Sequence, residues 1–305
     1  MLQPASSPIP SIFDAPPTSS RWAAANDEFR AAAARDPSLL SRSSFAEVNG
    51  DPALRWFRLQ PWPLFVESGR RQQIAQAAVA MDRLIKAAIE RIFQAEPARV
   101  AAHFSSNDAG TGVMRTFAPD AATLARLAGE PNGIRAAPSR ADYIETADGL
   151  KCVEYNAGGF LGGMCLEALA ERYLASPAIA RFLERHGLTA RAPGTTRALM
   201  RHMFREAVRM RTWSGGPFNV AIIALPSSQE LLDLHDQARY ERELNTVLQA
   251  AGIRAGGRVF VCADRDVREV GGRLVVDGHP VHSVMEHHAG SGDTRLVFRH
   301  FKMGR

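Results

Sequence analysis

The sequence predicts an α/β protein, in which a helix-rich N-terminal region with a β-hairpin precedes a small parallel sheet. Three stretches support this prediction. Residues 68–93 repeat apolar side chains at the helical interval. Residues 140–156 hold two strand-like runs around a glycine-containing turn, as in a β-hairpin. Residues 218–262 follow the order strand, long helix, strand, which is typical of a parallel sheet.

The same patterns divide the chain into three expected segments. Residues 1–20 are rich in proline and serine, so we expect a disordered N-terminal segment. Residues 21–214 form the helix-rich domain that carries the hairpin. The character of the sequence changes at Gly215-Gly216-Pro217, which indicates a domain boundary. Residues 215–305 then form a small α/β domain, which we expect to be incomplete at its C-terminus.

Composition excludes several classes of protein. The chain of 305 residues is long enough for two domains with separate cores. Its formal charge of +5 comes from scattered arginines, which predicts affinity for small anions but no nucleic-acid-binding stripe. The three cysteines form no CxxC pair, which indicates a reduced, cytoplasmic protein. No signal peptide and no apolar run of ~18 residues occurs, so we expect no membrane segment.

Helices are expected at four places besides the hairpin region. The apolar pattern predicts helices over residues 22–34 and 68–93. A third helical pattern over residues 162–184 is interrupted at Pro177, because proline lacks the N–H that a continuing helix needs. A fourth covers residues 193–211.

The C-terminal region predicts a strand over residues 218–225, a helix over 229–251 and a strand over 258–262. Parallel sheets bind ligands beyond the carboxyl ends of their strands, so Ser227, Ser228 and Gln229 are candidate contacts. The runs RLVVDG and HPVHSVMEHH, over residues 273–288, predict a further hairpin closed by an Asp-Gly turn.

The hairpin over residues 140–156 carries the clearest candidate site. A three-residue turn, Ala147-Asp148-Gly149, is a favoured hairpin connection, and it sets the register of the two strands. The expected opposite pairs are Thr146 with Leu150, Ile144 with Cys152, Asp142 with Glu154, and Arg140 with Asn156. Opposite residues share a face of the hairpin. A two-residue loop would instead place Tyr143 opposite Glu154 and loosen the cluster.

Two carboxylates directly opposite each other need a cation between them. One solution is a divalent metal, because Glu154 and Asn156 offer hard oxygen donors that suit a magnesium ion also bound by substrate phosphates. The other is an ion pair of Arg140 with Asp142 or Glu154 on a half-exposed hairpin. The pattern of residues leaves both readings open.

Two more features have a functional and a structural interpretation. Gly162 and Gly163 begin a predicted helix whose free amides would point toward Glu154 and Asn156, where a phosphate or carboxylate could bind. A tight strand-to-helix turn explains the same glycines. The histidine-rich run near residues 279–288 lacks a complete tetrahedral set for zinc. The chain also has no P-loop lysine motif, GxGxxG after a strand, or GxSxG.

A family resemblance rests on these same residues. The pattern Arg140-x-Asp142-Tyr143, then Val153-Glu154-x-Asn156 and Gly162-Gly163, resembles eukaryotic-type glutathione synthetases, the related glutathionylspermidine synthases and other circularly permuted ATP-grasp ligases. The likeness continues in HDQARYEREL over residues 235–244 and in RLVVDGHPVHSVM over residues 273–285. It covers residues 130–290, and only the hairpin motif is specific.

The resemblance implies roles for seven residues. Glu154 and Asn156 would hold Mg²⁺ against the phosphates of ATP, with Gly162 and Gly163 in the cofactor site. The substrate would be contacted by Arg140, Asp142 and Gln237. The family's asparagine one helical turn before Gln237 is Asp233 here, so the acceptor need not be the family's own. The implied fold places a pre-ATP-grasp-like substrate domain over residues 215–305.

The implied function is the substrate- and metal-binding portion of an ATP-dependent carboxylate–amine ligase that works through an acyl phosphate. Its partners would be a small carboxylate and a small amine, and it would bind neither nucleic acid nor a membrane. The protein could form a homodimer. Members of the family continue into ATP-grasp lobes, so we expect a fragment or a shortened relative. The alternative functions are a non-catalytic binding protein for a small anionic ligand or peptide, and an inert structural fragment.

Overall fold

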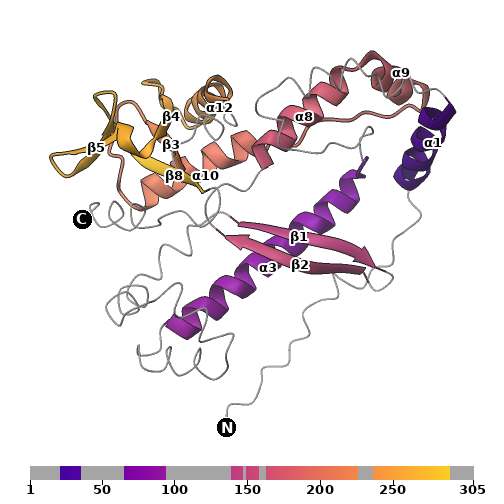
Figure 1. The fold of residues 1–305 in the computed structure, drawn as a ribbon, viewed down its shortest axis with the longest axis horizontal. Coiled ribbons are helices and arrows are strands. Elements are labelled where there is room, and N and C mark those ends of the chain that lie inside the picture. Colours follow the sequence, from indigo (N-terminus) through magenta and orange to yellow (C-terminus); the bar gives the residue numbers. More distant parts are fainter. Residues whose placement is uncertain are drawn as a thin grey trace, which may run out of the picture. The chain divides into compact units, whose positions relative to one another are not determined.

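A computed structural model of the chain describes residues 21–35, 65–93, 139–146, 149–157, 163–225 and 236–288 (Figure 1). The protein is mixed α/β, with an antiparallel hairpin and a small parallel sheet, which confirms the predicted fold class. The described residues fall into two compact units. The expected disordered segment over residues 1–20 lies outside the described residues.

The first unit combines one long helix with the hairpin. Helix α3 (Ser68–Phe93) confirms the helix predicted from periodicity. Strands β1 (Ser139–Thr146) and β2 (Gly149–Ala157) pair antiparallel, and β1 contacts α3. One face of the hairpin therefore packs on the helix, and the opposite face carries the candidate site.

The second unit begins with helices that confirm the predicted pattern. They are α1 (Arg21–Arg35), α8 (Gly163–Ala175), α9 (Pro177–Arg185) and α10 (Thr195–Arg209). The predicted interruption lies between α8 and α9, where Ser176 is extended and Pro177 starts the new helix. The rings of Phe29, Phe65 and Phe182 pack together, with Phe29 edge-on to Phe182 at 5.0 Å.

A three-stranded parallel sheet forms the centre of the second unit. Strands β4 (Val259–Ala263), β3 (Val220–Leu225) and β8 (Ser283–His288) lie in that order, and helix α12 (Gln237–Ala250) precedes β4 (Figure 1). The run VAIIAL in β3 is apolar throughout because both of its faces are covered. Helices α10 and α12 cover one face. The buried residues on that side are Met200, Met203, Ala207, Phe218, Val220, Ile222, Tyr240, Leu244, Val247, Leu248, Val259 and Met285.

This core crosses the boundary expected at residues 214 and 215. Met200 and Met203 of α10 share one buried cluster with Phe218 and Val220. Helix α10 thus packs with the parallel sheet, whereas the hairpin packs with α3. The division into domains over residues 21–214 and 215–305 stays a prediction.

The other face of the parallel sheet is covered by a small antiparallel sheet. Its strands are β5 (Val267–Val270), β6 (Arg273–Val276) and β7 (His279–Pro280), after a short 3-10 turn, η2 (Asp264–Asp266). The predicted Asp-Gly turn closes β6 and β7, with φ of 49° at Asp277 and 77° at Gly278. None of the described helices is long and apolar enough to cross a membrane.

The predicted partner arm of this hairpin, HPVHSVMEHH, is only partly correct. It splits after β7, and β8 leaves to pair with β3 in parallel. Buried Asn219 explains the split: its side-chain amide donates to the Pro280 carbonyl, and its backbone carbonyl accepts from the His282 N–H. The backbone N–H of Asn219 also donates to Nδ1 of His282, at 3.0 Å.

The Asn219–His282 contact predicts a loss of stability in mild acid. Nδ1 must be unprotonated to accept the bond, and burial, with the charge of Arg273, lowers the pKa of His282. The unfolded chain therefore takes up this proton first, and stability falls as pH drops below the ordinary histidine pKa of about 6.5. The slope from this residue stays below about 1.4 kcal/mol per pH unit because the folded and unfolded states differ by at most one bound proton at this ring.

Urea unfolding measured at several pH values between about 5 and 8 checks this expectation. His282→Gln keeps an acceptor but cannot be protonated, so its free energy of unfolding should change less across this range than that of the wild type. Equal pH dependence in both proteins would contradict the assignment. The same substitution at His279, a partly exposed histidine 2.9 Å from Arg258, is the matched control.

Candidate functional site

The hairpin brings the predicted cluster together by a route that the sequence did not indicate. Arg140 lies opposite Asn156 and Asp142 lies opposite Glu154, as predicted. Toward the turn the register shifts by one residue, so Tyr143 lies opposite Cys152. Strand β2 therefore carries a bulge at Val153, where two residues oppose one.

The predicted pairs nearer the turn are wrong. Ile144 lies opposite Lys151 rather than Cys152, and Thr146 lies opposite Gly149 rather than Leu150. The strands are thus joined by two residues, not three, and the left-handed φ of 100° at Gly149 ends the connection. In this register an unbroken hairpin would place Ala141, not Asp142, opposite Glu154, but the bulge restores the predicted pair.

Arg140 is locked to its neighbour on the same strand. Its Nε donates to Oδ1 of Asp142 at 2.8 Å, and its Nη2 donates to Oδ2 at 3.0 Å. This bidentate geometry is the strongest form of an arginine–carboxylate contact. The guanidinium thus balances the charge of Asp142. For Asp142, the structure shows the ion pair that was one of the two interpretations of the sequence. Glu154, opposite Asp142, is exposed.

The amide of Asn156 links Arg140 to Glu154. One of its terminal atoms lies 3.2 Å from Oε1 of Glu154, and the other lies 3.1 Å from Nη2 of Arg140. Hydrogen bonding assigns the nitrogen to the glutamate side and the oxygen to the arginine side. Arg140, Asn156 and Glu154 therefore form one chain of polar contacts on the exposed face of the hairpin.

The reverse orientation of this amide suits a divalent cation. It would place two oxygens, one each from Asn156 and Glu154, 3.2 Å apart. Adjacent ligands of an octahedral Mg²⁺ are about 3 Å apart, since each lies about 2.1 Å from the metal at a right angle. In the described ranges, the hairpin included, no three His, Cys, Asp or Glu side chains gather as a metal site. The pair fits a magnesium ion that takes its other ligands from water or phosphate.

Asp82 of α3 holds both strands of the hairpin by hydrogen bonds. Its Oδ1 accepts from the hydroxyls of Ser139 and Tyr155, both at 2.6 Å, and Lys86 lies 3.0 Å from its Oδ2. Burial opposes ionisation of Asp82, but the three donors outweigh it and lower the pKa of this carboxyl. Burial and Asp82 together raise the pKa of Tyr155, so its hydroxyl stays a donor.

Gln237 is held in a structural contact. It begins α12, and its side-chain oxygen accepts from the Val261 N–H of β4 at 3.0 Å. Glu241 accepts from the Val259 N–H in the same way, and Asn245 accepts from the Gly257 N–H. Helix residues four apart are separated by about 6 Å, which matches the spacing of alternate strand residues. This geometry accounts for Gln237, whose substrate role stays a prediction.

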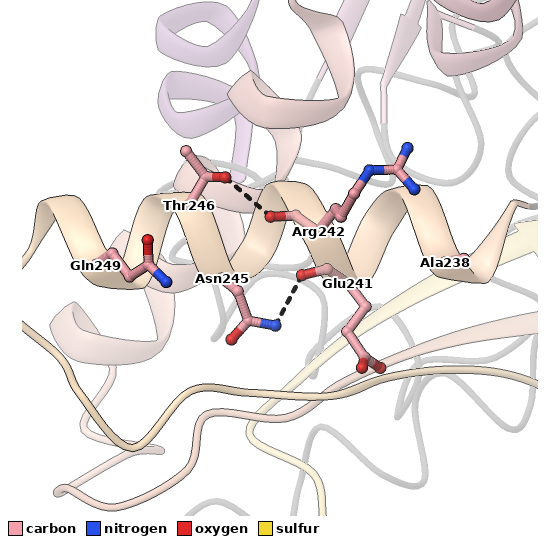
Figure 2. Close-up of a pocket in the computed structure, with 6 residues that line it drawn as sticks. All are labelled: Ala238, Glu241, Arg242, Asn245, Thr246 and Gln249. Carbon is pink, nitrogen blue, oxygen red and sulfur yellow. Dashed lines mark hydrogen bonds between the residues drawn. The ribbon is translucent and has the colours of Figure 1, made fainter.

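The side chains of Glu241 and Asn245 also border an open groove along α12. Figure 2 shows Glu241 and Asn245 leaving one side of α12 and Arg242 and Thr246 leaving the other. The groove is lined by Ala238, Glu241, Arg242, Asn245, Thr246 and Gln249. Two of the six are already used to bond β4, and the groove holds no convergent set of catalytic groups.

The remaining predicted residues are only partly covered. Gly163 begins α8, and its carbonyl accepts from the Thr195 hydroxyl at 2.7 Å. It belongs to a different unit from Glu154 and Asn156, so their approach stays a prediction. Gly162, Asp233 and the run from Ser227 to Gln229 lie outside the described residues.

Two carboxylates with clear roles were missed by the sequence analysis. Asp82 was one, although its spacing of four from Lys86 on a helix is a recognisable signal. The other, Glu167 of α8, is buried and accepts from the Thr196 N–H at 2.7 Å. It caps α10, whose own N-cap residue, Gly194, has no side chain to do so. No local signal marks such a cap, because it comes from another helix.

Comparisons with known proteins add little to this picture. No protein-family model matches the chain, and no characterised protein sequence matches it. Among solved structures, the chain is similar to a glutathione synthetase-like effector from Globodera pallida in the apo form, with 16% sequence identity and a TM-score of 0.32. The match covers 53% of this chain and 42% of that one, so the chain spans less than half of that structure. The family suggested by the hairpin motif therefore stays a prediction.

Proposed function

We propose that the chain is the substrate- and metal-binding portion of an ATP-dependent carboxylate–amine ligase. One observation carries the proposal: Arg140, Asn156 and Glu154 lie in contact on one face of the hairpin, and a turn of the Asn156 amide would let its oxygen share a cation with Glu154.

The proposal gives each hairpin residue a task. Glu154 and Asn156 would hold Mg²⁺, which neutralises charge on the phosphoryl group that ATP transfers to the substrate acid. Turning the Asn156 amide toward the metal would point its NH₂ group at Nη2 of Arg140. Two donors would then face each other, so Arg140 would be released from Asn156 and could bind a substrate carboxylate. Asp142 would keep the guanidinium in place during this change.

The other parts of the proposal extend beyond the hairpin. Gly162 and Gly163 would lie near the ATP phosphates, and Gln237 would contact the acid or the amine. Both substrates would be small molecules, and the acid would be converted to an acyl phosphate before the amine attacks. A reduced, cytoplasmic setting is part of the proposal, because Cys152 is a free cysteine.

A second candidate function also has an observation in its favour. Without any metal, Arg140, Asp142, Asn156 and Glu154 already satisfy one another by hydrogen bonds and an ion pair. A non-catalytic protein could use the exposed guanidinium of Arg140 to bind a small anion or an acidic peptide. Binding of that kind would need no magnesium.

Calorimetric titration of ATP into the full chain, with and without Mg²⁺, separates the two candidates. We expect heat only when Mg²⁺ is present. Glu154→Ala should weaken binding more than the about 10- to 100-fold typical of outer-shell partners, because a direct ligand is lost. Glu269→Ala, an exposed glutamate on β5, serves as the matched control and should bind like the wild type.

Three results would count against the ligase proposal. They are the absence of heat with Mg-ATP, equal binding by Glu154→Ala and wild type, and equal binding without Mg²⁺. Anion binding that is independent of magnesium and lost in Arg140→Ala would favour the second candidate instead.

A further inference from the structure

Helix α10 presents a row of arginines to solvent. Arg197, Arg201, Arg205 and Arg209 recur at every fourth position, and all four are exposed. We call these four residues the arginine face. The opposite side of the helix packs into the core through Thr196, Met200, Met203 and Ala207. The orientation of α10 is thus fixed by its buried side, and the arginine face is exposed to solvent.

The middle of the arginine face carries unbalanced charge. At its ends, Arg197 pairs with Glu243 at 2.6 Å and Arg209 pairs with Glu206 at 2.7 Å. In the part of the chain that the structure describes, no carboxylate pairs with Arg201 or Arg205. The other exposed residues of the helix are Ala198 and Val208, and the one acid of α10, Glu206, is partly buried and pairs with Arg209.

Solvation of an ordinary surface helix accounts for scattered arginines but not for this arrangement. Like charges four residues apart on a helix destabilise it by about 0.2–0.5 kcal/mol per pair. The row contains three such pairs in succession, between Arg197 and Arg201, Arg201 and Arg205, and Arg205 and Arg209. The helix dipole offsets this only near the C-terminal turn. A negatively charged partner would remove the repulsion along the whole row.

We propose that the arginine face docks an acidic α-helix of a partner protein. Side chains four residues apart on a helix lie about 6 Å apart and form a ridge along its surface. The ridges of two helices interdigitate when the helices cross at about −50°. Glutamates at every fourth position of a partner helix would therefore face the arginines in register. Each guanidinium can hold a carboxylate by two parallel hydrogen bonds.

Apolar residues at one end of the row favour a protein partner over a lipid or nucleic-acid partner. Val208 is 46% exposed and Met210 is 48% exposed, next to Arg205 and Arg209. Methionine and arginine are both enriched in protein interfaces, and an apolar contact beside charged pairs gives an anchor. A membrane-bound helix needs a broad apolar face, but that of α10 is buried in the core. The arginine face has no aromatic residue on which bases could stack.

Fluorescence anisotropy with a synthetic probe tests the proposal on the full chain. The acidic probe is a labelled alanine-based helix of about 16 residues with glutamate at every fourth position and one leucine after the last glutamate. The neutral probe has glutamine in place of each glutamate. We expect the acidic probe to bind at least about tenfold more tightly than the neutral one, with affinity falling as salt rises. The double variant R201E/R205E should lose at least about tenfold in affinity for the acidic probe.

A matched control comes from α9. Arg181 and Arg185 are also exposed and four residues apart, so R181E/R185E makes the same change in charge at another surface of the same unit. It should leave affinity for the probe within about twofold. Circular dichroism and the thermal midpoint should show that both double variants remain folded.

Several outcomes would overturn the proposal. One is an equal loss of affinity in R201E/R205E and R181E/R185E, which would reduce the effect to net charge. Another is no preference for the acidic probe. Tighter binding of anionic lipid vesicles or single-stranded RNA than of the acidic helix, lost in R201E/R205E, would replace the protein partner by a membrane or a nucleic acid. None of these outcomes depends on magnesium or ATP, so they are independent of the ligase proposal.

Discussion

Replacing Gly257 with alanine is expected to destabilise the second unit by about 4 kcal/mol or more. An added Cβ would lie 2.0 Å from the backbone carbonyl oxygen of Phe218, and 3.0 Å and 3.1 Å from side-chain carbons of Leu248 and Leu244. A backbone oxygen cannot move aside as a flexible side chain can, so β3 and β4 would have to separate locally. Urea unfolding monitored by circular dichroism measures the loss.

Gly194→Ala is the matched control for this substitution. Gly194 has a φ of −81°, and no atom lies within 4 Å of an added Cβ. Its free energy of unfolding should fall by no more than about 1 kcal/mol, because alanine is a poorer N-cap residue than glycine. A loss below about 1 kcal/mol for Gly257→Ala would mean that β3 and β4 are not packed as closely as the structure has them.

The second large effect is expected at Asn219, where Asn219→Ala should cost about 3 kcal/mol. The side chain donates to the Pro280 carbonyl at 2.9 Å and accepts from the Arg258 N–H at 3.1 Å, and only 3% of the residue is exposed. Truncation would leave a buried carbonyl and a buried N–H without partners, and each such group costs about 1–3 kcal/mol. Chemical denaturation gives the value directly.

Asn245→Ala offers a control with the same chemistry and less burial. Its amide donates to the Gly257 carbonyl at 3.0 Å and accepts from the Gly257 N–H at 2.9 Å, and it also donates to the Glu241 carbonyl within its own helix at 2.9 Å. The residue is partly exposed, so water can replace the lost bonds, and we expect a cost of about 1 kcal/mol. Equal losses at Asn219 and Asn245 would show that burial of Asn219 does not set its importance.

Local signals in the sequence predicted most of the elements. The periodicity of residues 68–93 and the proline at 177 each act within a few residues, so α3 and the break before α9 could be read directly. The split between β7 and β8 could not. It depends on Asn219, which lies 61 residues from Pro280 in the sequence, and contacts of that separation leave no local pattern.

The candidate site shows the same division. Arg140 and Asp142 are two apart on one strand, so their shared face follows from strand geometry. The bulge at Val153 and the support from Asp82 depend on how the hairpin packs against α3, which residues 140–156 alone do not determine. The exposed side of the site could thus be predicted from the sequence, whereas the residues that hold it in place could not.

The hydrogen bonds from α12 to the outer edge of β4 also have a consequence for the whole sheet. Gln237, Glu241 and Asn245 accept hydrogen bonds from N–H groups of β4 and of Gly257 just before it. The following outward-facing N–H of the same strand, that of Ala263, donates to Asp266 at 3.0 Å. An incoming strand from another molecule would find every one of these donors occupied. Edge strands protected in this way resist aggregation by strand addition. Growth of the sheet is therefore closed at β4, and removing Glu241 and Asn245 together would open that edge to a neighbouring chain.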